Sequence, residues 1–174
     1  RRISDHFREM AHRDALTGLY NRRFVDERLP ALLGEALARG TPISVAIVDL
    51  DHFKRINDTL SHSTGDTVLQ HIAQLLAEAA AGPDLVARMG GEEFLLAFPG
   101  VDAVDAARRC ERLRLAIRAH LWQPVTGTLP VTASIGVTTT ADGVGTMSAL
   151  LAQADRNLYT AKRGGRDQVV ADTA

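Results

Sequence analysis

The stretch Arg88-Met89-Gly90-Gly91-Glu92-Glu93-Phe94 joins two apolar runs through a pair of glycines and places two carboxylates beside them. Leu85-Val86-Ala87 leads into it, and the apolar residues 94–98 lead out. Glycine reaches positive φ at little cost, so we expect the two glycines to close a two-residue hairpin with Glu92 and Glu93 at its tip. Alone, such a turn is more often a solvated hairpin than a catalytic one. Partner residues must therefore decide whether the tip carries chemistry.

A second acidic segment follows a run that predicts a buried strand. Residues 43–48 are apolar and partly β-branched, and Asp49-Leu50-Asp51 comes directly after them. Substrates of open α/β sheets bind beyond the carboxyl ends of strands, so packing this strand beside the hairpin would bring Asp49, Glu92 and Glu93 together. Clustered carboxylates repel one another unless a cation neutralises them, and an oxygen-only set suits Mg²⁺ or Mn²⁺ that carries phosphates. The pattern indicates phosphoryl or nucleotidyl chemistry.

Residues 90–94 (GGEEF) resemble the signature of the GGDEF-domain diguanylate cyclases, in its GGEEF form. Four further segments resemble that family in order and spacing: residues 14–23 (DALTGLYNRR), 49–58 (DLDHFKRIND), 62–66 (HSTGD) and 161–166 (AKRGGR). The resemblance runs from Asp14 to about Val170. Five ordered motifs in one domain-sized segment are far more specific than any one of them.

Length and composition predict one globular domain. The chain has 174 residues, of which 45% are hydrophobic and 24% charged, enough for a core of its own. By the resemblance, residues 14–174 form the GGDEF catalytic domain. Ile3, Phe7 and Met10 recur at helical spacing in residues 1–13, which predicts either the end of an upstream signalling helix that pairs outside the domain or an amphipathic helix packed on it. The abrupt start at Arg1-Arg2 suggests a fragment of a longer protein.

The remaining composition narrows the function classes. The net charge of −1 provides no basic field for nucleic acid or for an anionic membrane. No apolar run approaches the roughly 18 residues of a membrane span, so we expect no membrane contact by this fragment. The single cysteine, Cys110, excludes an internal disulfide and fits a reducing cytoplasm, where it is expected to be a small core residue. We therefore expect a cytoplasmic domain that serves as the output domain of a longer protein with an upstream sensor.

The element order predicts an α/β fold with a mixed central β-sheet flanked by helices, because the hairpin is antiparallel while helical crossovers favour parallel pairs. The resemblance implies the palm-like fold shared with polymerases and class III nucleotide cyclases. We expect Asn21 to cap a helix over 22–39, Ser63 or Thr64 to cap the helix after residue 62, and Asp102 to open a third. That third helix is expected to bury the residues Val104, Ala107, Cys110, Leu113 and Ile117. A strand over 131–140, a helix over 147–163 and a short strand over 168–170 complete the prediction.

The resemblance implies a reaction and a metal site. It implies condensation of two GTP into cyclic di-GMP and two pyrophosphates, with attack of a 3′-hydroxyl on an α-phosphate assisted by two Mg²⁺ (or Mn²⁺) per active site. Asp49, the Leu50 carbonyl and Glu92 are the implied ligands, and Glu93 is a further ligand or the group that deprotonates the hydroxyl. Asp51 is left open between a metal-site role and a cap for the following helix.

Substrate contacts are implied in the same way. Asn57 and Asp66 would read guanine, since a carboxylate accepts its N1 and N2 protons and adenine cannot match this pattern. Leu16 and Phe53 would supply apolar walls for the base. The implied phosphate contacts are Lys54, Lys162, Arg166 and the backbone amides of His52 and Phe53. Each has an ordinary structural alternative, such as Lys162 facing a helix carboxyl end.

Three positions depart from the family pattern. Ser61 stands where glycine is usual and His52 where an aromatic residue is frequent, so the loop near the guanine pocket differs in detail. Upstream of the signature, family members commonly carry an inhibitory Arg-x-x-Asp motif, and the matching segment here, residues 81–84, keeps Asp84 but has Ala81 in place of arginine. The sequence therefore predicts no high-affinity product site there, and product inhibition at the active site instead.

The product implies a homodimer, because one domain offers one GTP site and the reaction joins two GTP reciprocally. The alternative from another class is a catalytically silent module that binds GTP or cyclic di-GMP. A polymerase-like enzyme acting on nucleic acid is disfavoured by the near-neutral charge and by the lack of a basic, aromatic-lined groove.

Overall fold

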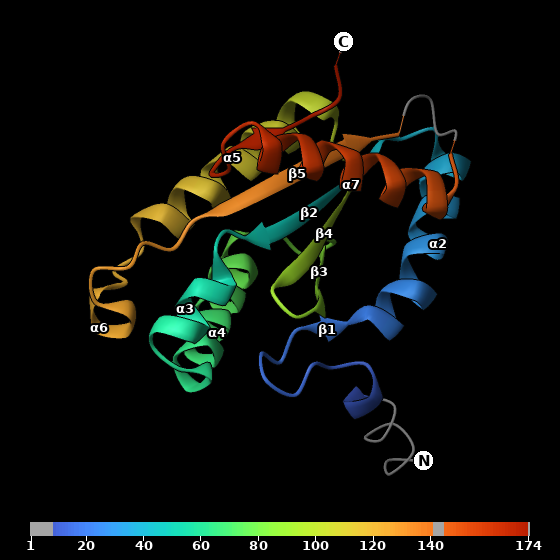
Figure 1. The fold of residues 1–174 in the computed structure, drawn as a ribbon. Helices are drawn as coiled ribbons and strands as arrows, with labels where there is room; N and C mark the ends of the chain where they lie inside the picture. The colour runs from blue at the N-terminus through green and yellow to red at the C-terminus, as the bar shows by residue number, and fades with distance from the viewer. Residues whose placement is uncertain (1–8, 141–144, 174) are drawn as a thin grey trace.

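Six strands form one mixed sheet in a computed structural model that describes residues 9–140 and 145–173 (Figure 1). The strands are β1 (Tyr20–Asn21), β2 (Ile43–Leu50), β3 (Leu85–Gly90), β4 (Glu93–Pro99), β5 (Ala133–Thr139) and β6 (Val169–Val170). Their order across the sheet is β1-β3-β4-β2-β5-β6. β2 lies at the centre, antiparallel to β4 and β5, whereas β1–β3 and β5–β6 are parallel pairs. This arrangement confirms the predicted mixed sheet.

Helices cover both faces of the sheet. They are α2 (Arg22–Arg39), α3 (Phe53–Thr59), α4 (His62–Ala79), α5 (Ala103–Ala119), α6 (Gln123–Thr126) and α7 (Met147–Arg163). Side chains of a strand alternate between faces, so Ala46 and Val48 join the core under α4 and α5, while Val45 and Ile47 pack toward α2 and α7. Figure 1 shows α7 lying along β5, with α3 and α4 projecting where the arrow of β2 ends.

A glycine sets the distance between α7 and the sheet. A Cβ added to Gly136 of β5 would clash with backbone atoms of Leu158 and Ala154 on α7. Only glycine lets the helix backbone rest directly on the strand at this point. The close contact fixes the end of α7, and with it Lys162, beside the carboxyl end of β2.

The predicted helix starts are partly confirmed. Asn21 caps α2 by accepting a 3.1 Å hydrogen bond from Phe24 N, and Asp102 caps α5. The prediction for α4 was wrong: Ser61, not Ser63 or Thr64, is the cap, and its Oγ accepts from Thr64 N at 3.0 Å. The helix therefore begins two residues earlier than expected.

The buried face of α5 also differs at one end. Cys110, Leu113 and Ile117 are buried as predicted, but Val104 is 65% exposed and Ala106 is buried instead. Val104 lies in the first turn of α5, beside a cavity that Val137 and Thr139 of β5 also line. Of the predicted upstream helix, Ile3 and Phe7 lie outside the described residues, and Met10 is 60% exposed at the end of a short helical turn.

Candidate active site

The hairpin turn is one residue away from its predicted position. Gly90 pairs with Glu93, so the two-residue loop is Gly91-Glu92 and not the pair of glycines. The register shifts between Arg88 and Gly90, which leaves Met89 as a bulge that takes up one residue. Gly91 has φ 44°, the left-handed conformation that such a turn requires. Glu92 therefore sits in the turn, and Glu93 begins β4.

Arg88 ties this turn to the N-terminal segment, a role that the sequence did not reveal. Its guanidinium donates to the Gly91 carbonyl from Nε (3.0 Å) and Nη2 (2.8 Å), and its Nη1 lies 3.2 Å from Asp14 Oδ2. Asp14 also accepts from the backbone N–H and the hydroxyl of Thr17. No local spacing signals a pair 74 residues apart, so only a long-range contact prediction could have found it.

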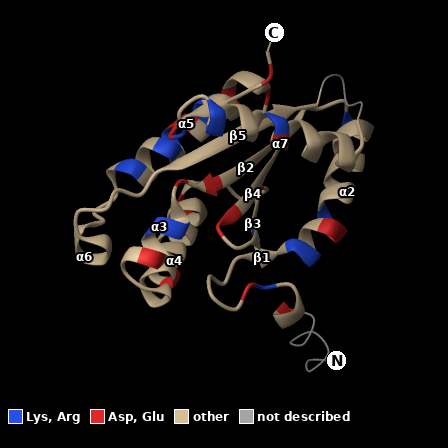
Figure 2. Cartoon of the chain, in the orientation of Figure 1, with Lys and Arg blue, Asp and Glu red and all other residues tan. Residues whose placement is uncertain are grey.

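The three predicted acids come together at the carboxyl end of β2. In the β2–β4 register, Asp49 stands directly opposite Glu93, so both side chains project from the same face about 5 Å apart at Cβ. Leu50 N donates to the Glu92 carbonyl at 3.3 Å, which holds the turn against the strand end. Figure 2 shows acidic positions in red at the arrow tip of β2 and at the β3–β4 turn. We call Asp49, Glu92 and Glu93 the acidic edge.

Lys162 points its ammonium into this edge from α7. Lys162 Nζ lies 3.0 Å from Asp49 Oδ1 and 2.9 Å from Asp51 Oδ1. The same nitrogen is 3.4 Å from the Leu50 carbonyl. The sequence predicted a phosphate contact for Lys162, and here it neutralises the acids.

Asp51 occupies the centre of a separate hydrogen-bond network. Its carboxylate accepts from Ser134 Oγ at 2.7 Å and from Thr132 Oγ1 at 2.8 Å, in addition to Lys162. It also accepts from the backbone N–H of Asp167 at 3.0 Å. It does not cap α3, whose N-cap is His52 with no side-chain cap bond.

The electrostatics separate these acids into two kinds. Burial raises the pKa of Asp49, and the carboxylates of Glu92 and Asp51 add to the rise while Lys162 opposes it. Burial also raises the pKa of Glu93, aided by Asp155 and Asp49 and opposed by Arg22. Burial acts against the charge of Asp51 as well, but the hydrogen bonds from Lys162, Ser134 and Thr132 outweigh it and leave its pKa lowered. Charge is thus unfavourable at Asp49 and Glu93 and well accommodated at Asp51.

The donor set of the acidic edge fits a hard divalent cation. All candidate ligand atoms are oxygens, namely the carboxylates of Asp49 and Glu92 and the Leu50 carbonyl. Burial, with a smaller contribution from neighbouring carboxylates, raises the pKa of Asp49, and a bound cation would stabilise its ionised form. Within the described ranges, no three His, Cys, Asp or Glu side chains are grouped so as to hold a metal by themselves. A cation here would therefore depend on the main-chain carbonyl and on substrate oxygens.

The predicted guanine residues lie together on α3 and α4. Within the part of the chain that the structure describes, Asn57 Oδ1 is a buried side-chain oxygen without a hydrogen-bond partner. It sits against Gly65, where an added Cβ would collide with it, so the glycine makes room for the amide. Phe53 is buried beside them, Asp66 follows Gly65 and is exposed, and Leu16 is partly buried against the same core. A buried acceptor without a donor indicates a ligand that supplies one.

Among the predicted phosphate residues, three are exposed to solvent and one lies against the acids. Lys54 and His52 are exposed on α3, and His52 takes the left-handed conformation with φ 55°. Arg166 is exposed in the turn after α7, with φ 64°. Lys162 is the member of the set that contacts the acids. Ser61, the other departure from the family pattern, has an extended backbone that any residue adopts.

The segment that matches the inhibitory motif is closed on itself. The Asp84 side chain is 1% exposed and forms an ion pair with Arg109 of α5. Its Oδ2 also accepts from Ala81 N at 2.8 Å. The Arg109 guanidinium in turn stacks over the Phe98 ring at 4.4 Å. The remaining acid of the motif is therefore buried and paired with an arginine of the same domain.

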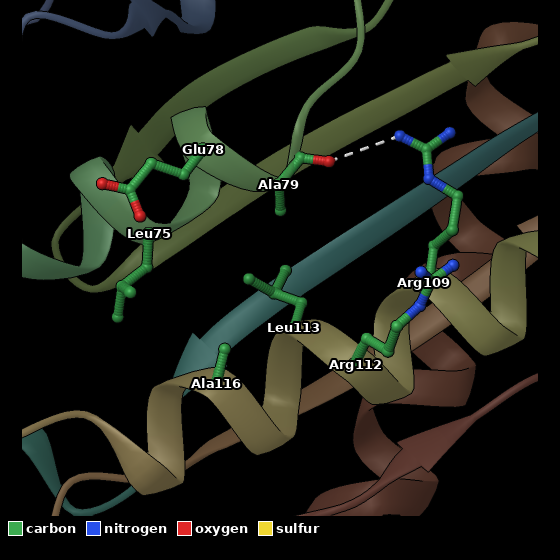
Figure 3. Close-up of a pocket in the computed structure, with 7 residues that line it drawn as sticks. All are labelled: Leu75, Glu78, Ala79, Arg109, Arg112, Leu113 and Ala116. Atoms are coloured by element: carbon green, nitrogen blue, oxygen red, sulfur yellow. Dashed lines mark hydrogen bonds between the residues drawn. The ribbon is translucent and has the colours of Figure 1, made fainter.

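Two cavities of similar size differ in their chemistry. One of about 400 Å³ lies between α4 and α5, lined by Leu75 and Glu78 on one side and by Arg112 and Leu113 on the other (Figure 3). It lies away from the acidic edge. The other, about 420 Å³, borders the hairpin turn and Asp14.

Cys110 is buried, and burial raises the pKa of its thiol to about 12, so it is a core residue as expected.

Comparison with known proteins agrees with this geometry. A family model described as "Diguanylate cyclase, GGDEF domain" matches residues 11–168. The response regulator PleD of Caulobacter vibrioides is 42% identical over 172 residues, which cover 98% of this chain and 38% of PleD. The coiled coil and GGDEF domain of DgcB from Caulobacter crescentus, solved in complex with c-di-GMP, has a TM-score of 0.89 at 35% identity, covering 98% and 92% of the two chains. Diguanylate cyclase SiaD from Pseudomonas aeruginosa, solved with its activator SiaC, has a TM-score of 0.86 at 40% identity, covering 98% and 70%.

The mixed six-stranded sheet with helices on both faces is the fold of GGDEF domains. The chain belongs to the GGDEF diguanylate cyclase family. Members of this family generally use a divalent metal. The chain spans 38% of the length of PleD and 24% of that of DgcP of Pseudomonas aeruginosa. Among the described helices, none is both long and apolar enough to cross a bilayer.

Proposed function

We propose that this domain condenses two GTP into cyclic di-GMP and two pyrophosphates. The proposal rests on Asn57 Oδ1, a buried oxygen without a hydrogen-bond partner among the described residues, because it favours a base that carries a hydrogen-bond donor. The raised pKa of Asp49 in addition favours a cation at the acidic edge. Family membership supplies the reaction class. The proposed substrate, GTP, and the single free cysteine are both consistent with a domain that acts in the cytoplasm.

Asp49, the Leu50 carbonyl and Glu92 would hold Mg²⁺ or Mn²⁺, two per active site, which would polarise the α-phosphate and acidify the attacking hydroxyl. Glu93 takes the proton of the 3′-hydroxyl. The 3′ oxygen bonds to the α-phosphorus of the other GTP, the α–β phosphoanhydride bond breaks, and pyrophosphate leaves. The same step on the second GTP closes the ring.

Asp66 and Asn57 select guanine. The Asp66 carboxylate accepts the N1 and N2 protons, and the Asn57 amide meets a further edge atom. Leu16 and Phe53 provide the apolar walls that hold the base. Adenine lacks the N1 proton and the N2 amino group, so it leaves both residues unpaired and is rejected.

Cations and backbone donors hold the triphosphate. Lys162 keeps Asp51 as one partner and turns its remaining N–H donors to the phosphates, since an ammonium has three. Lys54 and Arg166, both exposed beside the edge, add charge, and Arg166 adds a bidentate contact. The amides of His52 and Phe53 at the start of α3 complete the set.

The active unit is a two-fold homodimer with one GTP on each facing domain. Residues 1–13, as the end of an upstream helix joined to a sensor, raise the local concentration of the two domains. For this fragment, activity per molecule should therefore rise with protein concentration. Activity that stays flat in a monomeric range, checked by light scattering, would contradict the dimer.

Product control lies at the active site. Asp84 is paired with Arg109 and Ala81 supplies no guanidinium, so residues 81–84 form no inhibitory site. Cyclic di-GMP inhibits by presenting its guanines to Asn57 and Asp66, and this inhibition competes with GTP.

The test is incubation of the fragment with GTP and Mg²⁺, with identification of the product by mass spectrometry. Wild type should form cyclic di-GMP and two pyrophosphates. Asp49→Asn and Glu93→Gln should form product at least about a hundredfold more slowly while they stay folded, and Glu78→Gln, which removes an acid on α4 away from the edge, should behave as wild type. GTP binding without product would favour the silent regulatory module, and wild-type rates in Glu93→Gln would overturn the mechanism.

A further inference from the structure

Donors within the protein occupy all the hydrogen-bond acceptor sites of the Asp51 carboxylate. Its side chain is 1% exposed, and each oxygen accepts two donors: Oδ1 from Lys162 and Ser134, Oδ2 from Thr132 and the Asp167 amide. A carboxylate offers about four lone-pair sites, so none remains for a metal ion. Asp51 is thus distinct in role from Asp49, two residues earlier on the same face.

We infer that Asp51 is a positioning residue, which holds Lys162 and the turn carrying Arg166 in the arrangement that receives the triphosphate. The inference rests on the proposed function, and it assigns Asp51 neither metal ligation nor helix capping. We call Lys162 and residues 164–168 together the phosphate arm.

The turn of the phosphate arm needs outside support. Gly165, Arg166 and Asp167 have φ of 117°, 64° and 46° in succession. Two of these three are not glycine, and such residues are strained in the left-handed region. A turn with this conformation persists only where neighbouring groups hold it.

Two groups clamp the turn from opposite sides. On the inside, Asp51 Oδ2 accepts from Asp167 N at 3.0 Å. On the outside, Arg114 of α5 donates from Nη1 to Asp167 Oδ1 at 2.8 Å, and Arg118 Nη1 lies 3.3 Å from Oδ2. Arg166 immediately precedes Asp167 in the chain, and its side chain is exposed. Because Asp51 directly follows β2, its hydrogen bond to Asp167 fixes the backbone next to Arg166 relative to that strand.

The same carboxylate limits where the Lys162 ammonium can go. Lys162 Nζ is 2.9 Å from Asp51 Oδ1 and 3.0 Å from Asp49 Oδ1, so it is held at the acidic edge by two acids. If Asp49 turns to a cation, Asp51 still keeps Nζ at that place. Without Asp51, a flexible four-carbon side chain would have no fixed partner there.

Asp51→Asn tests the inference because asparagine cannot serve four donors. Its NH₂ group would face two of the donors that the carboxylate now accepts. We expect affinity for an α,β-methylene GTP analogue, which releases no pyrophosphate, to fall about ten- to a hundredfold, and affinity for GMP to change little. Calorimetry on folded protein measures both constants.

A double-mutant cycle separates positioning from a general loss of structure. If Asp51 acts through Lys162, Asp51→Asn in a Lys162→Met background should weaken analogue binding far less than it does in wild type. Ser44→Ala is the matched control, because it removes a buried hydrogen-bonding side chain at the other end of β2. It should lower stability and leave the analogue-to-GMP ratio unchanged.

Hydrogen exchange of the Asp167 amide tests the clamp without any nucleotide. It should be protected in wild type and should exchange at least tenfold faster in Asp51→Asn. Unchanged exchange, additive effects in the cycle, or equal losses for the analogue and GMP would each overturn the inference. A wild type that binds neither nucleotide would instead contradict the proposed function, and the exchange rates would still decide whether Asp51 holds the turn.

Discussion

The acidic edge and the turn at residues 81–84 both place an aspartate next to a lysine or an arginine. The turn is a structural contact, whereas the edge has the features of a binding site. In the turn, the Asp84 side chain is 1% exposed and its Oδ2 is held by Arg109 and by the Ala81 amide, so little of this carboxylate is accessible to a ligand. At the edge, Asp49 keeps a raised pKa despite Lys162, and Asn57 nearby holds an oxygen without a partner. A binding site therefore differs from a structural contact in having polar groups that the protein itself does not satisfy, and the presence of an acid alone does not distinguish the two.

The largest expected effect sets chemistry at the edge against structure at the turn. Glu93→Gln should lower kcat by about 10²–10⁴, the usual contribution of a positioned proton acceptor. Asp84→Ala should leave kcat near wild type wherever the protein is folded. Steady-state kinetics with a pyrophosphate assay measures both, and a turn variant as inactive as the edge variant would break the comparison.

Asp84→Ala should instead reduce stability. It leaves the partly buried Arg109 guanidinium without its carboxylate, which should cost about 3 kcal/mol, the low end for breaking a buried pair. Denaturant unfolding gives this value. Inhibition by cyclic di-GMP should remain competitive with GTP in wild type and variant alike. A non-competitive pattern in wild type that Asp84→Ala abolishes would show that the turn does bind product.

Two glycines offer a comparison of packing in the same regions. Gly136→Ala would drive a methyl group into the backbone of α7 and should cost about 1–3 kcal/mol, with weaker binding of nucleotide because Lys162 shifts. Gly82→Ala meets no atom within 4 Å and should be neutral or slightly stabilising. Thermal unfolding of the two variants measures the difference, and equal melting temperatures would contradict the close contact of α7 with β5.

The smallest expected effects concern pH and have opposite signs in the two kinds of acid. Burial raises the pKa of Glu93 in the folded state, so its ionised form opposes folding at neutral pH, and this cost disappears as the pH falls through the folded-state pKa. Glu93→Gln should therefore raise Tm at pH 7 by a few degrees and leave it unchanged near pH 4.

Asp14 serves as the opposite case. Burial acts against its charge, but Thr17 and Arg88 outweigh it and lower its pKa below the ordinary 3.8. Its stabilisation is present above that value and is lost as the pH falls through the lower folded-state pKa. Asp14→Asn should lower Tm at pH 7 and have little effect near pH 2. Tm against pH, measured for both variants, checks the two signs.

Much of this architecture follows from patterns within single segments. The apolar run 43–48, the capping residues Asn21 and Asp102 and the helix 147–163 all appear where local signals put them. The errors are local too. The bulge at Met89 moved the turn by one residue to Gly91-Glu92, and the cap of α4 is Ser61, two or three residues before the predicted Ser63 or Thr64.

Residue types and spacing alone determined that acids follow a central strand and that a glycine-containing turn carries two more. The expectation that Asn57 and Asp66 read guanine came from the resemblance to the family. Only the tertiary structure decided which aspartates have capacity to spare. Asp51 and Asp84 read like Asp49 along the chain, but their donors, Thr132, Asp167, Lys162 and Arg109, come from 25 to 116 residues away. A carboxylate's role depends on how many donors surround it in space, and that number is set when distant segments pack together.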